Sequence, residues 1–208
     1  ATGFYTPGVG GANGTWAAGP SLPNSTGTPD APMAPLTNGK ILLAVSPVPT
    51  SANHFPTPTT FWEFDPTALT YTQVGAPGGG TSVNAAAYTF NFICLPDGTV
   101  LCSRQGSSSY WAYVPDGSPL AAAKPVVTLL QRATTGVYTI TGLQLNGNNE
   151  GASYGDDWQM NTNFPVVRLS NAAGQIFTAR TFNWSSTGVQ TGTTSVTTQM
   201  TLPANLVP

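Results

Sequence analysis

Side chains able to do chemistry are sparse in this sequence, and the densest group is acidic. Asp156 and Asp157 are adjacent in the segment SYGDDWQ, with Glu150 and Asn161 close by in the chain. Carboxylate and amide oxygens are the ligands that Ca²⁺ prefers, so these residues are candidates for a calcium site. Their spacing matches no calcium-binding loop, however, and Gly-Asp-Asp is also ordinary turn chemistry. We therefore favour a turn and expect no metal and no other cofactor.

The remaining titratable residues suggest no catalytic group. The chain has one His, His54, in a Pro-rich stretch. Ser and Thr are abundant, but a hydroxyl becomes a nucleophile only beside a base such as His or a suitable Lys. The other acidic residues and two lysines are expected in loops, in linkers or at strand ends, without a partner for acid–base chemistry. They are Asp30, Glu63, Asp65, Asp116, Lys40 and Lys124. The sequence therefore predicts that the protein is not an enzyme.

Aromatic side chains offer another kind of chemistry, which is stacking on the faces of sugars. Trp62, Tyr110 and Trp111 are the candidates for such stacking. In repeated β-sheets, however, aromatic residues commonly pack between neighbouring sheets, and we prefer that interpretation. Carbohydrate is therefore an alternative ligand, not the first expectation.

The two cysteines flank a turn in CLPDGTVLCS. If Pro96, Asp97 and Gly98 form a three-residue loop, Cys94 faces Val100 and Cys102 lies diagonally on the same face. Diagonal Cβ atoms are roughly 7 Å apart, which is too far for an unstrained disulfide. We favour two free thiols, with a disulfide as the alternative.

Composition indicates a folded protein with an uncharged polar surface. Apolar residues make up 40% of the chain, charged residues only 7%, and the net charge is −2. With six scattered Lys and Arg there is no basic patch, so nucleic acid is not an expected partner. No apolar run is long enough to insert into a membrane. We expect a secreted, extracellular protein with glycosylation candidates at Asn13, Asn24 and Asn183.

An internal repeat organises the first half of the chain. The turns Asn38-Gly39 and Asp97-Gly98 are 59 residues apart, and GTWAAGP and TYTQVGAP recur at a similar offset. A period of about 40–60 residues with a hairpin in each unit is typical of propeller blades. The repeat therefore predicts about two kelch-type blades within residues 1–122, and two blades are too few to close a ring.

The second half predicts a different all-β domain. Five short strands are expected in VVTLLQ, VYTITGLQL, FPVVRLS, GQIFTARTFNW and VTTQMTLP. Short antiparallel strands at such spacing indicate an immunoglobulin-like sandwich over residues 123–208. Because such a sandwich has at least about seven strands, its last strand is expected to be missing.

This order of domains resembles the galactose oxidase and glyoxal oxidase superfamily. The segment LQLNGNNEGASYGDDWQMNTNFPVVRL is similar to the C-terminal, early-set immunoglobulin-like domain of secreted bacterial kelch proteins. The resemblance implies a copper site with a Tyr-His pair ahead of the Pro-Asp-Gly turn and a His in the terminal domain. Here Tyr88 matches the Tyr, but Thr89 stands in place of the His, and the terminal domain has no His. Because copper in such sites depends on imidazole, we expect no copper radical oxidase activity.

We therefore expect a non-catalytic extracellular structural or adhesive protein. Incomplete blades and an incomplete sandwich expose strand edges, which attract other strands. The expected partner is a second copy of the chain, giving an oligomer or filament, or else a missing part of the same polypeptide. A carbohydrate-binding propeller module is the main alternative, and a fragment of a copper radical oxidase-like enzyme is a remote one.

Overall fold

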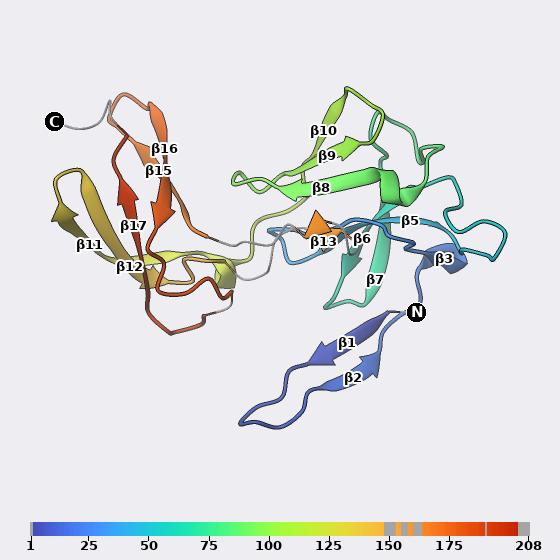
Figure 1. Cartoon of the computed structure of the whole chain (residues 1–208), viewed down its shortest axis with the longest axis horizontal. Coiled ribbons are helices and arrows are strands. Elements are labelled where there is room, and N and C mark those ends of the chain that lie inside the picture. Colours follow the sequence, from blue (N-terminus) through green and yellow to red (C-terminus); the bar gives the residue numbers. More distant parts are fainter. Residues whose placement is uncertain (1, 148–152, 155–157, 160–163, 190, 204–208) are drawn as a thin grey trace. The chain divides into compact units, whose positions relative to one another are not determined.

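The computed structural model shows an all-β protein (Figure 1). It describes residues 2–147, 153–154, 158–159, 164–189 and 191–203. Among these residues the helical segments are three 3₁₀ turns of three residues each. No helix in the described part of the chain is long and apolar enough to cross a membrane. The expectation of an all-β fold is confirmed.

The chain divides into two compact units. The first contains residues 1–116 together with residues 152–160, and the second contains residues 117–151 and 161–208. The boundary predicted after residue 122 thus lies inside the second unit, and a short segment from the second half of the sequence belongs to the first unit.

The first unit is built around a seven-stranded sheet, which we call the first sheet. Its order is β14-β13-β4-β5-β6-β7, and β3 also pairs with β5. The strands are β3 (Thr26–Gly27), β4 (Met33–Pro35), β5 (Ile41–Pro47), β6 (Thr60–Asp65), β7 (Thr70–Val74), β13 (Ser153–Tyr154) and β14 (Trp158–Gln159). Because β13 pairs with β4, the β13–β14 hairpin extends one edge of this sheet.

Two smaller sheets complete the first unit. The second sheet has the order β10-β9-β8, and its strands are β8 (Phe90–Cys94), β9 (Val100–Arg104) and β10 (Tyr110–Tyr113). The N-terminal hairpin consists of β1 (Gly3–Thr6) and β2 (Thr15–Ala18). All of these pairs are antiparallel between chain neighbours, which short connections favour.

The two predicted hairpin turns have the same local geometry. Each is a three-residue loop with two backbone hydrogen bonds. One joins the two residues that flank the loop, and in the other the N–H of the glycine donates to the carbonyl of the residue before the loop. Gly39 and Gly98 have φ angles of +90° and +88°, which glycine adopts at the lowest cost. The side chains of Asn38 and Asp97 each accept a hydrogen bond of 3.0 Å from the backbone N–H two residues later. The Asn38-Gly39 and Asp97-Gly98 turns are therefore structurally equivalent.

The equivalence continues into the strands. Leu43 of β5 lies opposite Trp62 of β6, and Cys102 of β9 lies opposite Trp111 of β10. Leu43 and Cys102 are 59 positions apart, whereas Trp62 and Trp111 are 49 positions apart. The offsets differ because the loop after β5 is longer than the loop after β9. FWEFDP in β6 thus corresponds to YWAYVP in β10.

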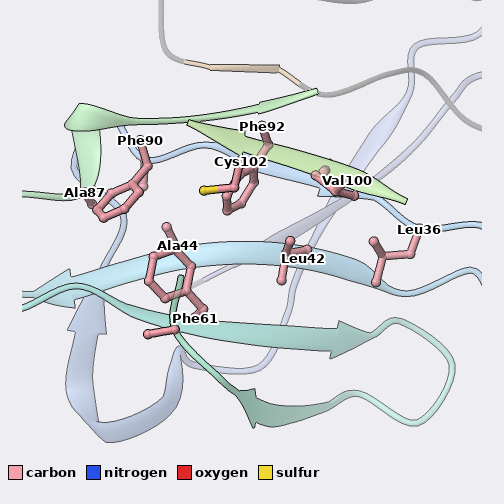
Figure 2. Packing of buried hydrophobic residues seen from close by; sticks show 12 residues of the cluster. Leu36, Leu42, Ala44, Phe61, Ala87, Phe90, Phe92, Val100 and Cys102 are labelled. Carbon is pink, nitrogen blue, oxygen red and sulfur yellow. The ribbon is translucent and has the colours of Figure 1, made fainter. Parts of the chain in front are cut away.

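The main core lies between the first and second sheets. Figure 2 shows Leu42, Ala44 and Phe61 of the first sheet pointing toward Phe90 and other side chains of the second sheet. The rings of Phe61 and Phe90 pack edge to face, with centroids 5.2 Å apart. Burying one such aromatic side chain stabilises a fold by about 1.5–3 kcal/mol.

The opposite face of the first sheet is also buried. Leu43, Val45, Trp62 and Phe64 form a second cluster there, covered by partly buried neighbours that include Phe4 of the N-terminal hairpin. The first sheet is therefore covered on both faces. This explains why consecutive residues of β5, Leu42–Ser46, are buried.

The second unit contains all five predicted strands. They are β11 (Val126–Thr134), β12 (Val137–Leu143), β15 (Val166–Ser170), β16 (Ile176–Phe182) and β17 (Val196–Thr201). They follow one path of hydrogen-bonded neighbours, β11-β12-β17-β16-β15. The beginning of β16 pairs with β15, and only its last two residues, Thr181 and Phe182, pair with β17. The core of this unit contains Ile140, Leu145, Ala179, Val196 and Met200.

Candidate functional site

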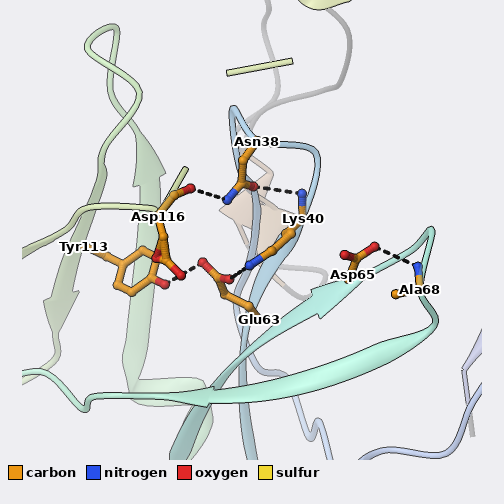
Figure 3. A network of polar contacts seen from close by, with 7 residues as sticks. All are labelled: Asn38, Lys40, Glu63, Asp65, Ala68, Tyr113 and Asp116. Carbon is orange, nitrogen blue, oxygen red and sulfur yellow. Dashed lines mark hydrogen bonds and ion pairs between the residues drawn. The ribbon is translucent and has the colours of Figure 1, made fainter. Parts of the chain in front are cut away.

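The most distinctive polar group of the described residues is a buried carboxylate between the two main sheets. Glu63 lies on β6 within the apolar strand FWEF and is only 2% exposed. Lys40 Nζ lies 2.6 Å from its Oε2, and the hydroxyl of Tyr113 donates to its Oε1 at 2.6 Å (Figure 3). Both oxygens of the carboxylate are therefore engaged, each by a donor from a different element.

This arrangement shifts the pKa values of both donors upward. Burial is the main cause that raises the pKa of Tyr113 well above its ordinary value of 10.0, and the hydrogen bond to Glu63 adds to it. The hydrogen bond to Glu63 is the main cause that raises the pKa of Lys40 above 10.5. Near neutral pH Lys40 is thus an ammonium and Tyr113 a neutral phenol. Because both carboxylate oxygens are paired, the site is a polar link between the two sheets, and we call it the Glu63 tie.

A second tie lies beside this one. Asn38 in the β4–β5 turn donates from Nδ2 to the backbone carbonyl of Asp116, after β10, at 2.9 Å (Figure 3). Asp65, at the end of β6, accepts from the backbone N–H groups of Ala68 and Thr67, and the bond from Ala68 is the larger of the causes that lower its pKa. The turn and strand ends on this side of the first unit are therefore fixed by polar contacts.

The expectations for two of these residues were wrong. Lys40 was expected at a solvated turn position and Glu63 at a strand end or in a loop, but Glu63 lies inside β6. It is ion-paired to Lys40, whose side chain is 29% exposed. The sequence did contain a signal for a buried ion pair, because Glu63 is a charged residue between the aromatic residues Trp62 and Phe64. A charge in such a place requires a partner. The identity of the partner could not be read from the sequence, because Tyr113 is 50 residues away.

An apolar pocket of about 160 Å³ lies next to the Glu63 site, between the two sheets. Its lining includes Phe61, Val74, Phe92, Trp111 and the turn that begins at Gly75. Pockets for drug-sized ligands have volumes of about 300–1,000 Å³. This pocket is below that range and has space only for a small apolar group.

The structure separates the three candidates for sugar stacking. Trp62 is 9% exposed in the core and donates its indole N–H to Thr60 Oγ1 at 2.9 Å. It therefore packs between layers, as the preferred interpretation has it, and presents no ring to a sugar. Trp111 is half-buried and packs against the main core. Tyr110 is 68% exposed on the other side of β10. Of the three, Tyr110 alone has a largely open ring.

The residues at the copper-site positions are engaged in local packing. Thr89 donates its hydroxyl to the carbonyl of Ala86 at 2.7 Å, and the ring of Tyr88 lies 4.7 Å from that of Phe55, centroid to centroid. The calcium candidates Glu150, Asp156 and Asp157 lie outside the described residues. Within the described part of the chain, no three His, Cys, Asp or Glu side chains come together in a way that could hold a metal ion. Comparison of the chain with protein-family models, curated proteins and solved structures gave no match.

The cysteines and their turn agree with the sequence expectation. Cys94 lies opposite Val100, Cys102 lies opposite Phe92, and neither cysteine is in a disulfide. Cys102 is buried in the main core, and this burial raises the pKa of its thiol to about 12. A core position thus explains why this thiol is held in its neutral form.

The three glycosylation candidates are all exposed. Asn13 lies in the loop of the N-terminal hairpin, Asn24 in a 3₁₀ turn, and Asn183 directly after β16. Asn183 donates from Nδ2, the atom to which a glycan would be attached, to Gln199 Oε1 at 2.8 Å. Asn13 and Asn24 are therefore the more accessible of the three, and whether any of them is modified stays a prediction.

Proposed function

We propose that this chain is a non-catalytic extracellular structural or adhesive protein that associates with copies of itself through strand edges. The observation that supports it most directly is β11, at the edge of the second unit's sheet. All nine of its residues are exposed, and four large apolar ones have exposed fractions of 46–59%. These four are Val126, Val127, Leu129 and Leu130.

The chemistry of β11 suits the addition of another strand. An edge strand presents unpaired N–H and C=O groups, and natural proteins protect such edges with charge, bulges or a covering segment. β11 has one charged residue, Arg132, and two irregularities in its pairing with β12. With 7% charged residues, the whole surface also supplies little repulsion between copies.

The finer description of the fold belongs to the same proposal. The four-stranded antiparallel run β4–β7 and its equivalence to β8–β10 support kelch-type blades. The five antiparallel strands of the second unit, with β16 passing from β15 to β17, support an immunoglobulin-like sandwich. Membership of the galactose oxidase-like group is part of this proposal.

The test is sedimentation velocity on the whole chain over a range of concentrations. The change is Val127→Lys on β11, which places a charge on the edge strand. The matched control is Val48→Lys, because the two valines are 59% and 55% exposed and Val48 follows β5. We expect the wild type and the control to associate alike and Val127→Lys to associate more weakly, because the edge strand β11 no longer contributes. A wild type that is monomeric at every concentration contradicts the proposal.

Carbohydrate binding is the second candidate, and the 68% exposure of Tyr110 favours it. A sugar face stacked on this ring is expected to lose affinity in Tyr110→Ala and to keep it in Trp62→Phe, since Trp62 is buried. Calorimetric titration against a broad panel of glycans measures this. No binding by the wild type to any glycan of the panel leaves the structural function as the single proposal.

A further inference from the structure

The first unit is a stack of three layers, each of which turns one face to the layer before it and the other to the layer after it. We call these the front face and the back face. The N-terminal hairpin turns its back face, with Phe4, onto the front of the first sheet, where the centroids of Phe4 and Phe64 are 6.3 Å apart. The first sheet turns its own back face, with Phe61, onto the front of the second sheet, with Phe90.

The back face of the second sheet has the same strand positions as the back face of the first, but it is open at β10. Phe61 lies opposite Ala44, and the equivalent residue Tyr110 lies opposite Ser103. Phe61 is 2% exposed, whereas Tyr110 is 68% exposed. Of the neighbouring positions on this back face, Ala112 is exposed, and Asn91, Ile93, Leu101 and Ser103 are half-buried. The position that is covered in the first sheet is therefore open in the second.

At the other end of the stack, the front face of the N-terminal hairpin is open. It carries Tyr5 opposite Trp16, with ring centroids 5.2 Å apart and exposed fractions of 52% and 74%. The first sheet has the same cross-strand aromatic pair on its front face, Phe64 opposite Tyr71, with centroids 4.7 Å apart. The hairpin thus presents the kind of aromatic pair that the front face of the first sheet carries.

Two glycines hold this aromatic pair in place. A Cβ at Gly14 would collide with the ring of Tyr5, and a Cβ at Gly3 would lie 3.2 Å from Cε3 of Trp16. Neither glycine has a positive φ, so their small size serves packing rather than backbone conformation. The hairpin is therefore shaped to display Tyr5 and Trp16 at fixed positions.

Resting on the proposed self-association, we infer that the open back face of the second sheet binds the front face of the N-terminal hairpin of a second copy. Tyr5 and Trp16 of one copy then pack against Tyr110 of the other. Both contacts between the three described layers join a front face to a back face. The back face of the second sheet and the front face of the hairpin lie at the two ends of the described stack and are open. Neither surface contains a charged residue. The contact is therefore apolar and resists added salt, unlike an association held by charge.

The geometry makes this contact head-to-tail. The two surfaces lie at opposite ends of the stack, so the same patch is not used on both copies. A bound pair still has one open back face, on one copy, and one open hairpin, on the other, and further copies add to them. A contact of this kind builds a filament or a ring rather than a two-fold dimer.

The test is a complementation experiment in sedimentation velocity with two variants of the whole chain, Tyr110→Glu and Trp16→Glu. Each is made in the wild type and in the Val127→Lys background, which removes association through β11. Both residues are largely exposed, so the fold is retained, which circular dichroism and thermal unfolding check. In the Val127→Lys background, each variant alone is expected to bind itself about 30-fold or more weakly than Val127→Lys binds itself, as for buried aromatic anchors. A one-to-one mixture in this background is expected to form heterodimers and stop there, because one intact hairpin then meets one intact back face. Val9→Glu in the same background, at an 87% exposed site in the loop of the same hairpin, is the matched control and is expected to behave as Val127→Lys does.

Each outcome separates this contact from the strand-edge proposal. If the two Glu variants associate as the wild type does while Val127→Lys is monomeric, strand-edge association stands and the front-to-back contact is wrong. A mixture that sediments as the sum of its monomers also overturns the contact. If the wild type is monomeric throughout, self-association itself is wrong.

Discussion

The first and second sheets share their turns and strand pairing but differ in how much of their surface is buried. The first sheet has a layer on each face, and residues Leu42–Ser46 of β5 are all buried. The second sheet has its core on one face, and β9 alternates between buried and half-buried positions. A continuous apolar run in a strand therefore indicates that both faces of the sheet are covered, whereas alternation indicates that one face is covered.

The largest effect on the free energy of unfolding is expected at Phe61, which is buried, whereas its equivalent Tyr110 is exposed. Phe61→Ala removes a ring that is 2% exposed in the main core and is expected to cost about 3–5 kcal/mol of unfolding free energy. Tyr110→Ala removes the equivalent ring, which is 68% exposed, and is expected to change stability by less than about 0.5 kcal/mol. Urea unfolding at low protein concentration measures both. Equal losses at the two positions contradict the assignment of covered and open back faces.

The tie between the sheets is expected to be the next most sensitive feature. Lys40→Met and Tyr113→Phe each leave one oxygen of the buried Glu63 carboxylate without its donor, at a cost of about 1–3 kcal/mol. The two losses are expected to be non-additive, because both donors act on one carboxylate. A double-mutant cycle by urea unfolding measures the coupling. Strict additivity would show that Lys40 and Tyr113 act independently of Glu63.

The equivalent turns allow a matched comparison of smaller size. Gly39→Ala and Gly98→Ala both place a side chain at a φ near +90°, which costs roughly 1–2 kcal/mol. Gly98 is also close to Thr37, whose Cγ2 would lie 3.1 Å from the new Cβ, so Gly98→Ala also requires a small shift of Thr37. Thermal unfolding of the two variants measures both losses. A substitution without effect at either glycine contradicts the shared turn geometry.

Sequence reasoning found the elements better than it found their contacts. The three-residue turns, the equivalent strands and the five strands of the second unit follow from local patterns, because turn residues and period-2 alternation are encoded within a few positions. The Glu63 tie was missed, and Trp62 could not be told apart from Tyr110 as a candidate for sugar stacking, because both depend on which layers cover the first sheet. Such long-range contacts leave no trace in the local pattern, apart from a charged residue among aromatic ones.

The last expected effect is the pH dependence of stability that comes from the groups buried between the sheets. It is absent at neutral pH and appears only in alkali. The pKa of the Cys102 thiol is raised by burial from 9.0 to about 12, and those of Tyr113 and Lys40 are also raised. In each case the folded protein holds a proton that the unfolded chain loses first, so the unfolded state binds fewer protons in alkali. Stability is therefore expected to be constant with respect to these groups up to about pH 9, and to fall as the pH rises from there through about 12.

Urea midpoints measured between neutral pH and pH 11 test this expectation, with Cys102→Ala and Tyr113→Phe as variants. Each variant is less stable at neutral pH because it leaves a cavity or an unpaired oxygen, but its loss of stability in alkali is expected to be shallower than that of the wild type. A matched comparison is Tyr110→Phe, which removes a phenol from the open back face, where the ring is 68% exposed. Its alkaline slope is expected to equal that of the wild type, because Tyr110→Phe leaves Tyr113, Lys40 and Cys102 in place. Parallel slopes for Tyr113→Phe and Tyr110→Phe would mean that the two faces of β10 do not differ in burial, and the layered stack would then be wrong.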